Sequence, residues 1–445
     1  MKACDYSLPT VRSLRTWIVP TLLFGLAGCA GWNQPIELAL PPPQPERHRF
    51  ALSGSQEMIG QLAALETVEG DTLPDIARHY GLGFQQIKDA NPALDEWLPP
   101  PGTRVALPTR FILPDAPRRG IVVNLAAMRL FYFPADRPSW EVETYPVGIG
   151  REGWSTPTGE MKIVDKEAFP VWHVPASVRE EHERKGDPLP ASVPAGPDNP
   201  LGDYAFYLSK PSYLMHGTNK PYGVGLRASH GCLRLYPEDI SALFRDVAVK
   251  TPLRVVNQPY LVGHAQGVVY LEAHRPFDEL NEKKLRAQLR KRLAKESASI
   301  DWARVDYALD VADGVPVPIS QGAPNPPAPL LSHPARLDGA PEPAPVIGPA
   351  DWAVNALDTA DEITARRMAA MLNHQGPRIP AQARETQGRY RVLAGPFPSA
   401  AEARKAQRRM QIEFDLKGEV LSSGQPAAKP PRKPRHAKRG VVPAK

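Results

Sequence analysis

The chain has 445 residues, of which 52 are proline, 54 are lysine or arginine and three are cysteine. This length suggests about three domains, and the clustered prolines exclude a single large globule, because proline-rich segments of small residues do not pack. The net charge of +6 comes from the C-terminal tail, because residues 429–445 hold seven basic residues and no acidic one. The rest of the chain, residues 1–428, has a net charge of −1. A basic, nucleic-acid-binding body is therefore not expected.

Residues 1–28 have the three-part pattern of a secretory signal. Basic residues precede the apolar run Trp17–Leu26, which is too short for the roughly 20 residues of a membrane-spanning helix. With Leu26-Ala27-Gly28-Cys29 after it, the segment resembles a bacterial lipoprotein signal. The resemblance implies cleavage after Gly28, lipidation of Cys29 and a periplasmic protein anchored to the outer membrane. A plain cleavable signal is the alternative.

Residues 29–60 include four prolines between positions 41 and 45 and predict a stiff tether. The next segment, 64–109, predicts a small β-α-α-β module. A strand at Val68 leads into a helix with Ile76, Ala77 and Tyr80 on one face, and Gly81 ends this helix. A second helix covers 84–90 and a last strand 105–107.

This module resembles a LysM domain, which binds the N-acetylglucosamine backbone of cell-wall glycan. The resemblance rests on Gly70-Asp71-Thr72-Leu73, Asn91-Pro92 and Gly102-Thr103, whereas Pro74 and Trp97 depart from the usual pattern. A small α/β cap without a ligand is the alternative.

Residues 118–262 predict a mainly β domain. Short runs of β-branched and aromatic residues are separated by turn residues, and long helical periodicity is scarce. The expected strands are 120–125, 128–133, 142–147, 161–164, 205–208, 214–216 and 253–256.

Two connecting segments follow the β domain. Residues 263–312 form an extension with a charged helix at 276–295, whose stripe of Leu280, Leu285, Leu289 and Leu293 is expected to pack against the β domain. Residues 313–350 are too poor in large apolar side chains to order themselves and predict a linker, since residues 314–350 contain eleven prolines.

Residues 351–422 predict a βαββαβ, ferredoxin-like module. Its first helix, 360–372, is expected to bury Ile363, Met368 and Leu372, and the strand 389–393 is expected to break at Gly395-Pro396-Phe397. With Tyr390-Arg391-Val392 and this Gly-Pro-Phe run, the module resembles a SPOR domain, which binds glycan strands stripped of stem peptides. A ferredoxin-like domain with another partner is the alternative. The basic tail, 423–445, suits anionic envelope polymers or is only a solvated end.

The chemistry concentrates around the only thiol that remains after export. Cys232 lies in Ser229-His230-Gly231-Cys232-Leu233-Arg234, sixteen residues after His216. A thiol nucleophile needs a base near neutral pH, and an imidazole can supply it. Gly231 lets the backbone approach a substrate, and Arg234 offers a forked donor for a carboxylate. A zinc site of His216, His230 and Cys232, or an inert buried cysteine, are the alternatives.

These residues resemble the catalytic motif of L,D-transpeptidases. The runs Pro146-Val147-Gly148-Ile149-Gly150 and Thr156-Pro157-Thr158-Gly159 are also familiar from the outer-envelope branch of that family. The resemblance implies a β-sandwich-like domain with Cys232 as nucleophile and His216 as general base and acid. Catalysis would also involve His230 and Gly231, and Ser229, Arg234, Gly217 and Tyr213 would contact the substrate.

The implied reaction needs no cofactor and no metal. The thiolate would attack the carbonyl between diaminopimelate and D-Ala in a peptidoglycan tetrapeptide stem, and D-Ala would leave. An amine would then take the acyl group and give a 3→3 cross-link or an attached envelope protein, whereas water would give an L,D-carboxypeptidase. A non-enzymatic tether from outer membrane to wall is the rival hypothesis, and nucleic acid is not expected as a partner because the basic tail has no aromatic residue to stack on bases.

Overall fold

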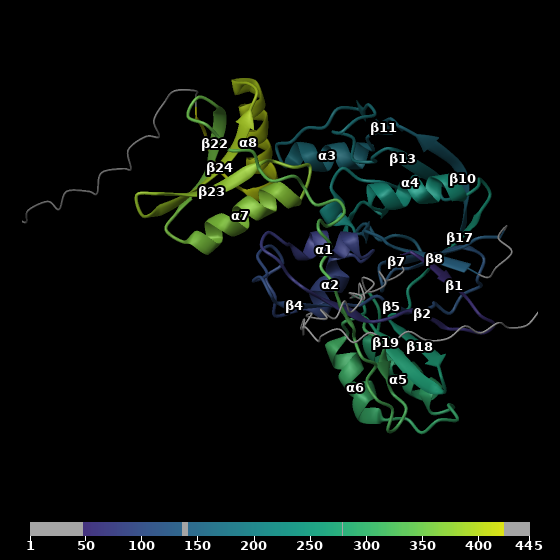
Figure 1. Cartoon of the computed structure of the whole chain (residues 1–445). Helices are drawn as coiled ribbons and strands as arrows, with labels where there is room; N and C mark the ends of the chain where they lie inside the picture. Colours follow the sequence, from purple (N-terminus) through teal and green to yellow (C-terminus); the bar gives the residue numbers. More distant parts are fainter. Residues whose placement is uncertain (1–47, 136–140, 278, 422–445) are drawn as a thin grey trace, which may run out of the picture. The chain divides into compact units, whose positions relative to one another are not determined.

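The computed structural model describes residues 48–135, 141–277 and 279–421 (Figure 1). The predicted signal, the predicted lipidation site Cys29 and the basic tail lie outside these residues. Within the described ranges, no helix combines the length and the apolar character needed to cross a bilayer.

The predicted βααβ order of the first module is confirmed. It comprises β3 (Ala63–Glu66), α1 (Leu73–His79), α2 (Phe84–Ala90) and β4 (Arg104–Leu107), with β3 antiparallel to β4. The first strand ends before Val68, because the Asp71 carboxylate accepts a hydrogen bond from the Val68 N–H and makes a turn there. Thr72 then caps α1, since its hydroxyl accepts from the Asp75 N–H at 3.2 Å.

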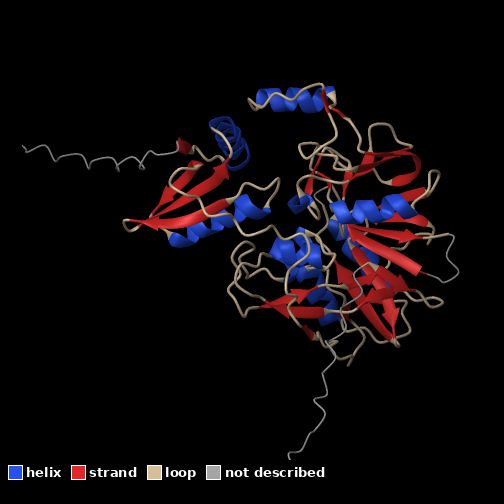
Figure 2. Cartoon of the chain, turned by 45° about the horizontal axis from the view of Figure 1, so that its top comes forward, coloured by secondary structure: helices blue, strands red, loops and turns tan. Residues whose placement is uncertain are grey.

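The catalytic region is mainly β, as predicted, and its largest sheet has nine strands (Figure 2). In spatial order these are β1 (Arg49–Ala51), β8 (Glu141–Pro146), β7 (Arg129–Phe133), β6 (Gly120–Asn124), β17 (Pro252–Val256), β10 (Gly159–Ala168), β13 (Tyr204–Leu208), β14 (Leu214–His216) and β16 (Leu233–Arg234). Smaller elements complete the region: β5 (Arg110–Ile112), β9 (Ile149–Gly150), β11 (Trp172–His173), α3 (Ala176–Arg184), β12 (Ser192–Val193), η1 (Pro221–Gly223), β15 (Arg227–Ser229) and α4 (Pro237–Asp246).

The middle of this sheet is buried on both faces. Along β7, Phe131 and Phe133 pack into one apolar cluster, while Leu130 and Tyr132 pack into another. The first cluster contains the core of the LysM module, and the second contains Ile240 of α4. Successive side chains of a strand point to opposite faces, so a strand such as β7, in which four consecutive aromatic or aliphatic residues are buried, fits a sheet that is covered on each side.

The predicted tether at 29–60 is wrong for its last part. Residues 49–51 form β1, which pairs with β8 at the edge of the large sheet, and β2 (Met58–Gly60) pairs with β5. Phe50 is buried in the cluster shared with the LysM module. This segment therefore contributes to the folded body, because it carries apolar residues that a neighbouring sheet can bury.

The expected packing of the charged helix is wrong as well. The helix α5 (Glu282–Leu293) begins at its cap Asn281, so Leu280 lies outside it. Leu289 and Leu293 pack with β18 (Tyr260–Ala265), β19 (Val268–Ala273) and α6 (Trp302–Val311) in a separate apolar cluster. Residues 260–320 thus form a small α/β unit with a core of their own.

The proline-rich segment 313–350 is ordered, contrary to the prediction. It contains β20 (Val317–Pro318), which joins β19, and β21 (Leu330–Leu331), which runs parallel to β3 of the LysM module. Ile319 and Leu337 are buried in the cores of neighbouring modules. A segment too poor in apolar residues to make a core can still be ordered when its few large side chains enter existing ones.

The last module has the predicted βαββαβ order. It comprises β22 (Trp352–Thr359), α7 (Glu362–His374), β23 (Ala381–Thr386), β24 (Arg389–Phe397), α8 (Ala400–Phe414) and β25 (Glu419–Leu421). Met368 and Leu372 pack inward as expected, but Ile363 is 57% exposed, because α7 starts at its cap Asp361 and presents Ala365 and Ala369 to the sheet. The expected break at Gly395 is also wrong, since β24 continues through it to Phe397.

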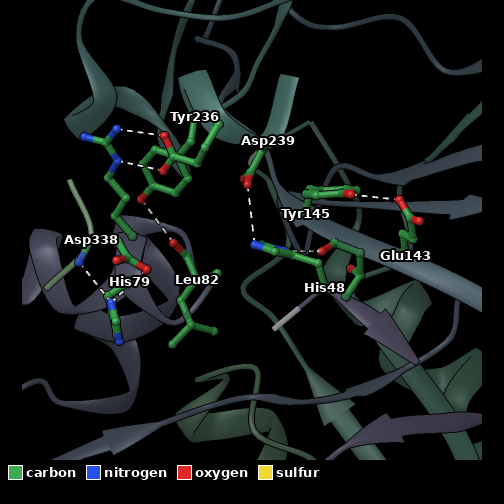
Figure 3. A network of polar contacts seen from close by, with 12 residues as sticks. His48, His79, Leu82, Glu143, Tyr145, Tyr236, Asp239 and Asp338 are labelled. Atoms are coloured by element: carbon green, nitrogen blue, oxygen red, sulfur yellow. Dashed lines mark hydrogen bonds and ion pairs between the residues drawn. The ribbon is translucent and has the colours of Figure 1, made fainter. Parts of the chain in front are cut away.

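The LysM module is fixed to the catalytic sheet by polar contacts as well as by the shared core. Figure 3 shows the Tyr236 hydroxyl donating to the Leu82 carbonyl at 3.1 Å. The Phe84 N–H donates to the Val224 carbonyl at 3.1 Å. At this point a side chain on Gly225 would stand 2.4 Å from the Gly83 Cα atom, so the two backbones touch.

Arg129 is the most constrained residue of this interface. Its guanidinium is fully buried, donates to the Gly81 carbonyl and to Gln86 at 2.8 Å each, and lies over the Phe111 ring. Burial lowers its pKa to about 9. A buried cation is tolerated here because carbonyl and amide oxygens surround it.

We therefore expect Arg129→Met to lower the free energy of unfolding by about 1–3 kcal/mol, because the buried Gly81 carbonyl loses its donor while the side-chain volume is kept. The measurement is urea unfolding of the full chain. Arg119→Met, at an exposed position, is the matched control and should change stability by less than about 0.5 kcal/mol. Equal stability of Arg129→Met and the wild type would contradict this role.

Candidate active site

Parallel strand pairing places His216 and Cys232 on neighbouring strands. His216 is the last residue of β14 and Cys232 immediately precedes β16, and the two strands pair in the register Met215 with Leu233 and His216 with Arg234. In this register Cys232 comes alongside Leu214, whose backbone makes a hydrogen bond to the thiol. Residues sixteen apart in the sequence therefore lie on two neighbouring strands at the edge of the large sheet, two positions apart along the pair.

The backbone fixes the orientation of the His216 ring. The side chain is buried, and Nδ1 lies 2.7 Å from the Gly217 carbonyl oxygen. Because a carbonyl can only accept, Nδ1 carries the proton and Nε2 keeps its lone pair. Burial, followed by the positive charge of Arg234, lowers the His216 pKa to about 3. The imidazole is therefore neutral at neutral pH and able to accept a proton at Nε2.

Cys232 is partly exposed, and its sulfur lies 3.9 Å from the Ser212 carbonyl oxygen. Burial of the sulfur raises the thiol pKa, and the hydrogen bond from Leu214 and the charge of Arg234 offset this only in part. Near neutral pH the pair consists of a neutral thiol and a neutral imidazole. A proton must move from sulfur to nitrogen when the thiol attacks an electrophile.

The residues before Cys232 form a tight loop. The Ser229 hydroxyl donates to the Cys232 carbonyl at 2.6 Å and accepts from the Gly231 N–H at 3.1 Å. Gly231 has a φ of +103°, and a side chain there would stand 2.8 Å from the Tyr213 ring. Only glycine fits this position without strain. The Gly231 N–H is thus bonded to Ser229 in this structure.

Arg234 combines an anchored backbone with an unusual side chain. Its N–H and carbonyl are both hydrogen-bonded to Gly148, at 2.9 and 2.8 Å. The guanidinium lies close to the Gly223 backbone, since a side chain on Gly223 would stand 2.8 Å from Arg234 Nη1. Burial lowers the pKa of this guanidinium. Its Nε atom is buried without a hydrogen-bond partner, and no carboxylate in the described ranges forms an ion pair with it. This cation can therefore offer its donors to an anion that is not part of the chain.

Four residues of the site were missed by sequence reasoning: Arg151, Trp154, Thr156 and Glu181. The Thr156 hydroxyl accepts from the Gly150 N–H at 3.0 Å and donates to the Gly231 carbonyl at 2.9 Å. The Trp154 ring meets the His230 ring edge-on. Thr156 lies in the run Thr156-Pro157-Thr158-Gly159, which is familiar from the family. Glu181 lies in α3, whose sequence contains no motif that points to the site.

The predicted site residues fall into two groups. Cys232, His216, Gly217, Arg234 and Tyr213 gather around the ends of β14 and β16, while His230 turns toward Arg151 and Glu181. Across the described parts of the chain, no group of three or more His, Cys, Asp or Glu side chains has the arrangement of a metal site. The arrangement suits nucleophilic attack by a thiol assisted by a neutral base.

Three regions of the chain match known protein families. The chain matches the L,D-transpeptidase catalytic domain over residues 118–255, the LysM domain over 67–108 and the SPOR domain over 348–421. The probable L,D-transpeptidase ErfK/SrfK of Salmonella typhimurium is 38% identical over 278 residues, which cover 60% of this chain and 89% of that protein. The probable L,D-transpeptidase YbiS of Escherichia coli is 42% identical over 224 residues, covering 49% and 72%.

Among solved structures, a crystal structure of an Enterococcus faecium L,D-transpeptidase is similar to this chain at 20% sequence identity and a TM-score of 0.23. The match covers 31% of this chain and 49% of the Enterococcus faecium chain. The curated relatives, which are matched over most of their length, are sufficient to assign the family. The chain belongs to the L,D-transpeptidase family: its catalytic domain acts on the peptidoglycan of the cell envelope, and its LysM and SPOR domains bind this polymer.

Proposed function

We propose that Cys232 is the nucleophile and His216 the general base of an L,D-transpeptidase that acts on tetrapeptide stems. The observation that supports this proposal is the pairing of β14 with β16, in which Cys232 lies two positions from His216 along the neighbouring strand, together with the Gly217 carbonyl that fixes the tautomer of the imidazole. The donor substrate is the carbonyl between diaminopimelate and the terminal D-Ala.

The reaction runs in two halves. The Cys232 proton moves to Nε2 of His216 as sulfur attacks the carbonyl, and the imidazolium then returns the proton to the leaving D-Ala amine. This leaves a thioester on Cys232. An acceptor amine attacks the thioester, His216 takes the amine proton, and the departing thiolate recovers it. The product is a 3→3 cross-link, or an attached envelope protein when the amine is a lysine.

Arg234 supplies positive charge for this chemistry. It lowers the pKa of Cys232 and has no carboxylate partner in the described chain, so it favours the thiolate and a substrate carboxylate. Tyr213 lies against Gly231 and, with Gly217 and Ser229, shapes the position of the acyl group. His230 and Gly231 hold the backbone that leads to the nucleophile.

Two other functions can be distinguished from this one. Water in place of the acceptor amine would make the protein an L,D-carboxypeptidase with the same residues. A tether between membrane and wall would need only the glycan-binding modules and the lipid on Cys29 that we propose for the outer-membrane anchor. It would have no use for an imidazole held in one tautomer beside a thiol.

Cys232→Ala should abolish formation of 3→3 cross-links, because no other residue provides the nucleophile. The measurement is mass spectrometry of muropeptides after incubation with tetrapeptide-rich sacculi, with and without a lysine-terminated acceptor protein. Co-sedimentation with sacculi should be unchanged and serves as the control for folding. Cross-linking by purified Cys232→Ala protein would refute the assignment.

His216→Ala should slow acylation of Cys232 by a tetrapeptide by about 10²–10⁴-fold, since the thiol proton loses its acceptor. The rate is measured as loss of free thiol at pH 7. His173→Ala, an exposed histidine on β11, is the matched control and should acylate normally. A His216→Ala rate within the error of the wild type would exclude His216 as the base.

Alkylation of Cys232 by iodoacetamide should increase with pH through a midpoint above 9.0, the ordinary thiol value, because the thiolate is the reactive form and burial raises the thiol pKa. Arg234→Met removes a positive charge that lowers this pKa and should shift the midpoint further upward. Arg254→Met, a surface change on β17, should leave it in place. A wild-type midpoint near neutral pH would contradict the neutral thiol–imidazole pair.

A further inference from the structure

Helix α5 has one side buried in a small core and a basic side that faces solvent. Leu289 and Leu293 lie in the apolar cluster that this helix shares with β18, β19 and α6 (Figure 1). At about 3.6 residues per turn, Lys284 and Lys291 lie on the side of the helix opposite these leucines. Five basic residues in and just after α5 are exposed and form no ion pair within the described ranges. We call them the basic face: Lys283, Lys284, Lys291, Arg292 and Lys295.

The two other arginines of α5 are neutralised by carboxylates of the same small unit. Arg286 forms ion pairs with Glu282 at 2.8 Å and with Asp310 at 3.1 Å. Arg290 pairs with Asp306 of α6. The acidic residues of α6 therefore compensate the side of α5 that faces them, and the charge of the basic face stays uncompensated.

Charge is distributed unevenly within this unit. Residues 260–320 contain nine basic and nine acidic residues, whereas residues 282–295 contain seven basic residues and one acidic residue, a net charge of +6. Exposed charges of one sign attract counter-charges within about one Debye length, which is ~8 Å at physiological ionic strength. The basic face therefore suits an anionic partner.

The segment that leads into α5 contacts the catalytic domain near the proposed nucleophile. Phe277 packs against the core of this domain, and the Arg227 guanidinium lies over its ring, 4.1 Å from the centroid. Arg227 also donates to Glu279 at 3.2 Å. Arg227 begins β15, which ends at Ser229, and the Ser229 hydroxyl donates to the Cys232 carbonyl. The basic face starts four residues after Glu279, so the chain keeps its first residue within about 15 Å of this contact.

This position favours peptidoglycan stems as the anionic partner. In the proposed function Cys232 acts on a tetrapeptide stem, which has carboxylates on its terminal D-Ala and on its diaminopimelate. The wall presents many such stems on one polymer, so the neighbours of the stem in the site bring negative charge close to the catalytic domain. An anionic phospholipid surface would match the charge of the basic face, but it would not account for the place of this face beside the nucleophile strand.

We propose that the basic face of α5 is a docking surface for the carboxylates of peptidoglycan stems that neighbour the stem being acylated. The surface holds the polymer against the catalytic domain and does not touch the reacting atoms. This inference rests on the proposed function, because it takes the stem peptide as the substrate of Cys232.

The test compares two sets of charge removals in the full chain with Cys232→Ala, so that binding is measured without turnover. Glutamine is the replacement, because it removes the charge and keeps the helix propensity of lysine. The basic-face variant combines Lys284→Gln, Lys291→Gln and Lys295→Gln. The control removes the same charge from exposed positions on other elements and combines Arg119→Gln, Lys162→Gln and Arg245→Gln. Equal urea midpoints of the two variants verify that both are folded, as surface changes predict.

Co-sedimentation gives the affinity of each variant for three particles: intact sacculi, sacculi freed of their stem peptides, and vesicles of anionic phospholipid. On intact sacculi the basic-face variant should bind about fivefold more weakly than the control at low salt, since exposed charges contribute little each. This difference should vanish at about 0.5 M salt, which screens exposed charges. On stem-free sacculi and on vesicles the two variants should bind equally, because both keep the LysM and SPOR domains.

A second measurement separates docking from chemistry. With Cys232 retained, the basic-face variant should be acylated by a soluble tetrapeptide muropeptide at the wild-type rate, because a single muropeptide has no neighbouring stem. On sacculi the same variant should need more substrate for half-maximal cross-linking and should reach the wild-type maximal rate.

Equal binding of the two variants to intact sacculi would overturn the docking surface. An equal loss on stem-free sacculi would also overturn it and assign the basic face to glycan, and a loss on vesicles alone would assign the face to lipid. If the wild type forms no acyl-enzyme from tetrapeptide, the proposed function fails instead. The binding comparison needs no thiol and still decides whether the basic face holds stem peptides, so the two failures are distinguishable.

Discussion

The active site depends on one strand pairing. The parallel contact between β14 and β16 is short, with two residue pairs, yet it is the contact that places His216 and Cys232 two positions apart on neighbouring strands. Backbone hydrogen bonds stabilise this pairing. Gly148 is hydrogen-bonded to both backbone groups of Arg234, and the Leu235 N–H donates to the His216 carbonyl at 2.9 Å. A shift of β16 by one residue would move Cys232 away from His216 and turn its side chain to the other face.

The electrostatics of the site follow from burial. Desolvation raises the pKa of the thiol and lowers that of the imidazole, so both partners are neutral before the substrate arrives. An unpaired thiolate in an oxidising compartment would be a liability. In the mechanism that we propose, a neutral thiol that gives up its proton only during attack avoids this, and Arg234 adds positive charge where negative charge develops.

The residues that we propose for the site could be selected from the sequence because they are close together in it. His216, Ser229, Cys232 and Arg234 lie within one short stretch, and each has a side chain suited to a step of thiol chemistry. Glu181 was not predictable, since it lies about fifty residues from its partner His230, in a helix without a distinctive pattern. The strands of the catalytic domain were predictable from their apolar runs, and the order of the LysM and SPOR elements from their turns and caps.

The errors in the fold share one physical cause. Residues 49–60 and 313–350 were expected to be unpacked because they cannot form cores by themselves, but Phe50, Ile319 and Leu337 enter the cores of other modules. The stripe of the charged helix was recognised, whereas its partner was not, because the sequence does not show that residues 260–320 fold together. Local composition describes what a segment can do alone, and long-range burial decides the rest.

The central claim is that an acyl group passes through Cys232. It is tested most directly by mixing the full-length enzyme with a purified tetrapeptide muropeptide without acceptor, quenching in acid and determining the mass of each proteolytic peptide. The account predicts an added tripeptide acyl group on the peptide that contains Cys232, and its release by hydroxylamine. An acyl group on any other residue, or D-Ala release without modification of Cys232, would contradict it.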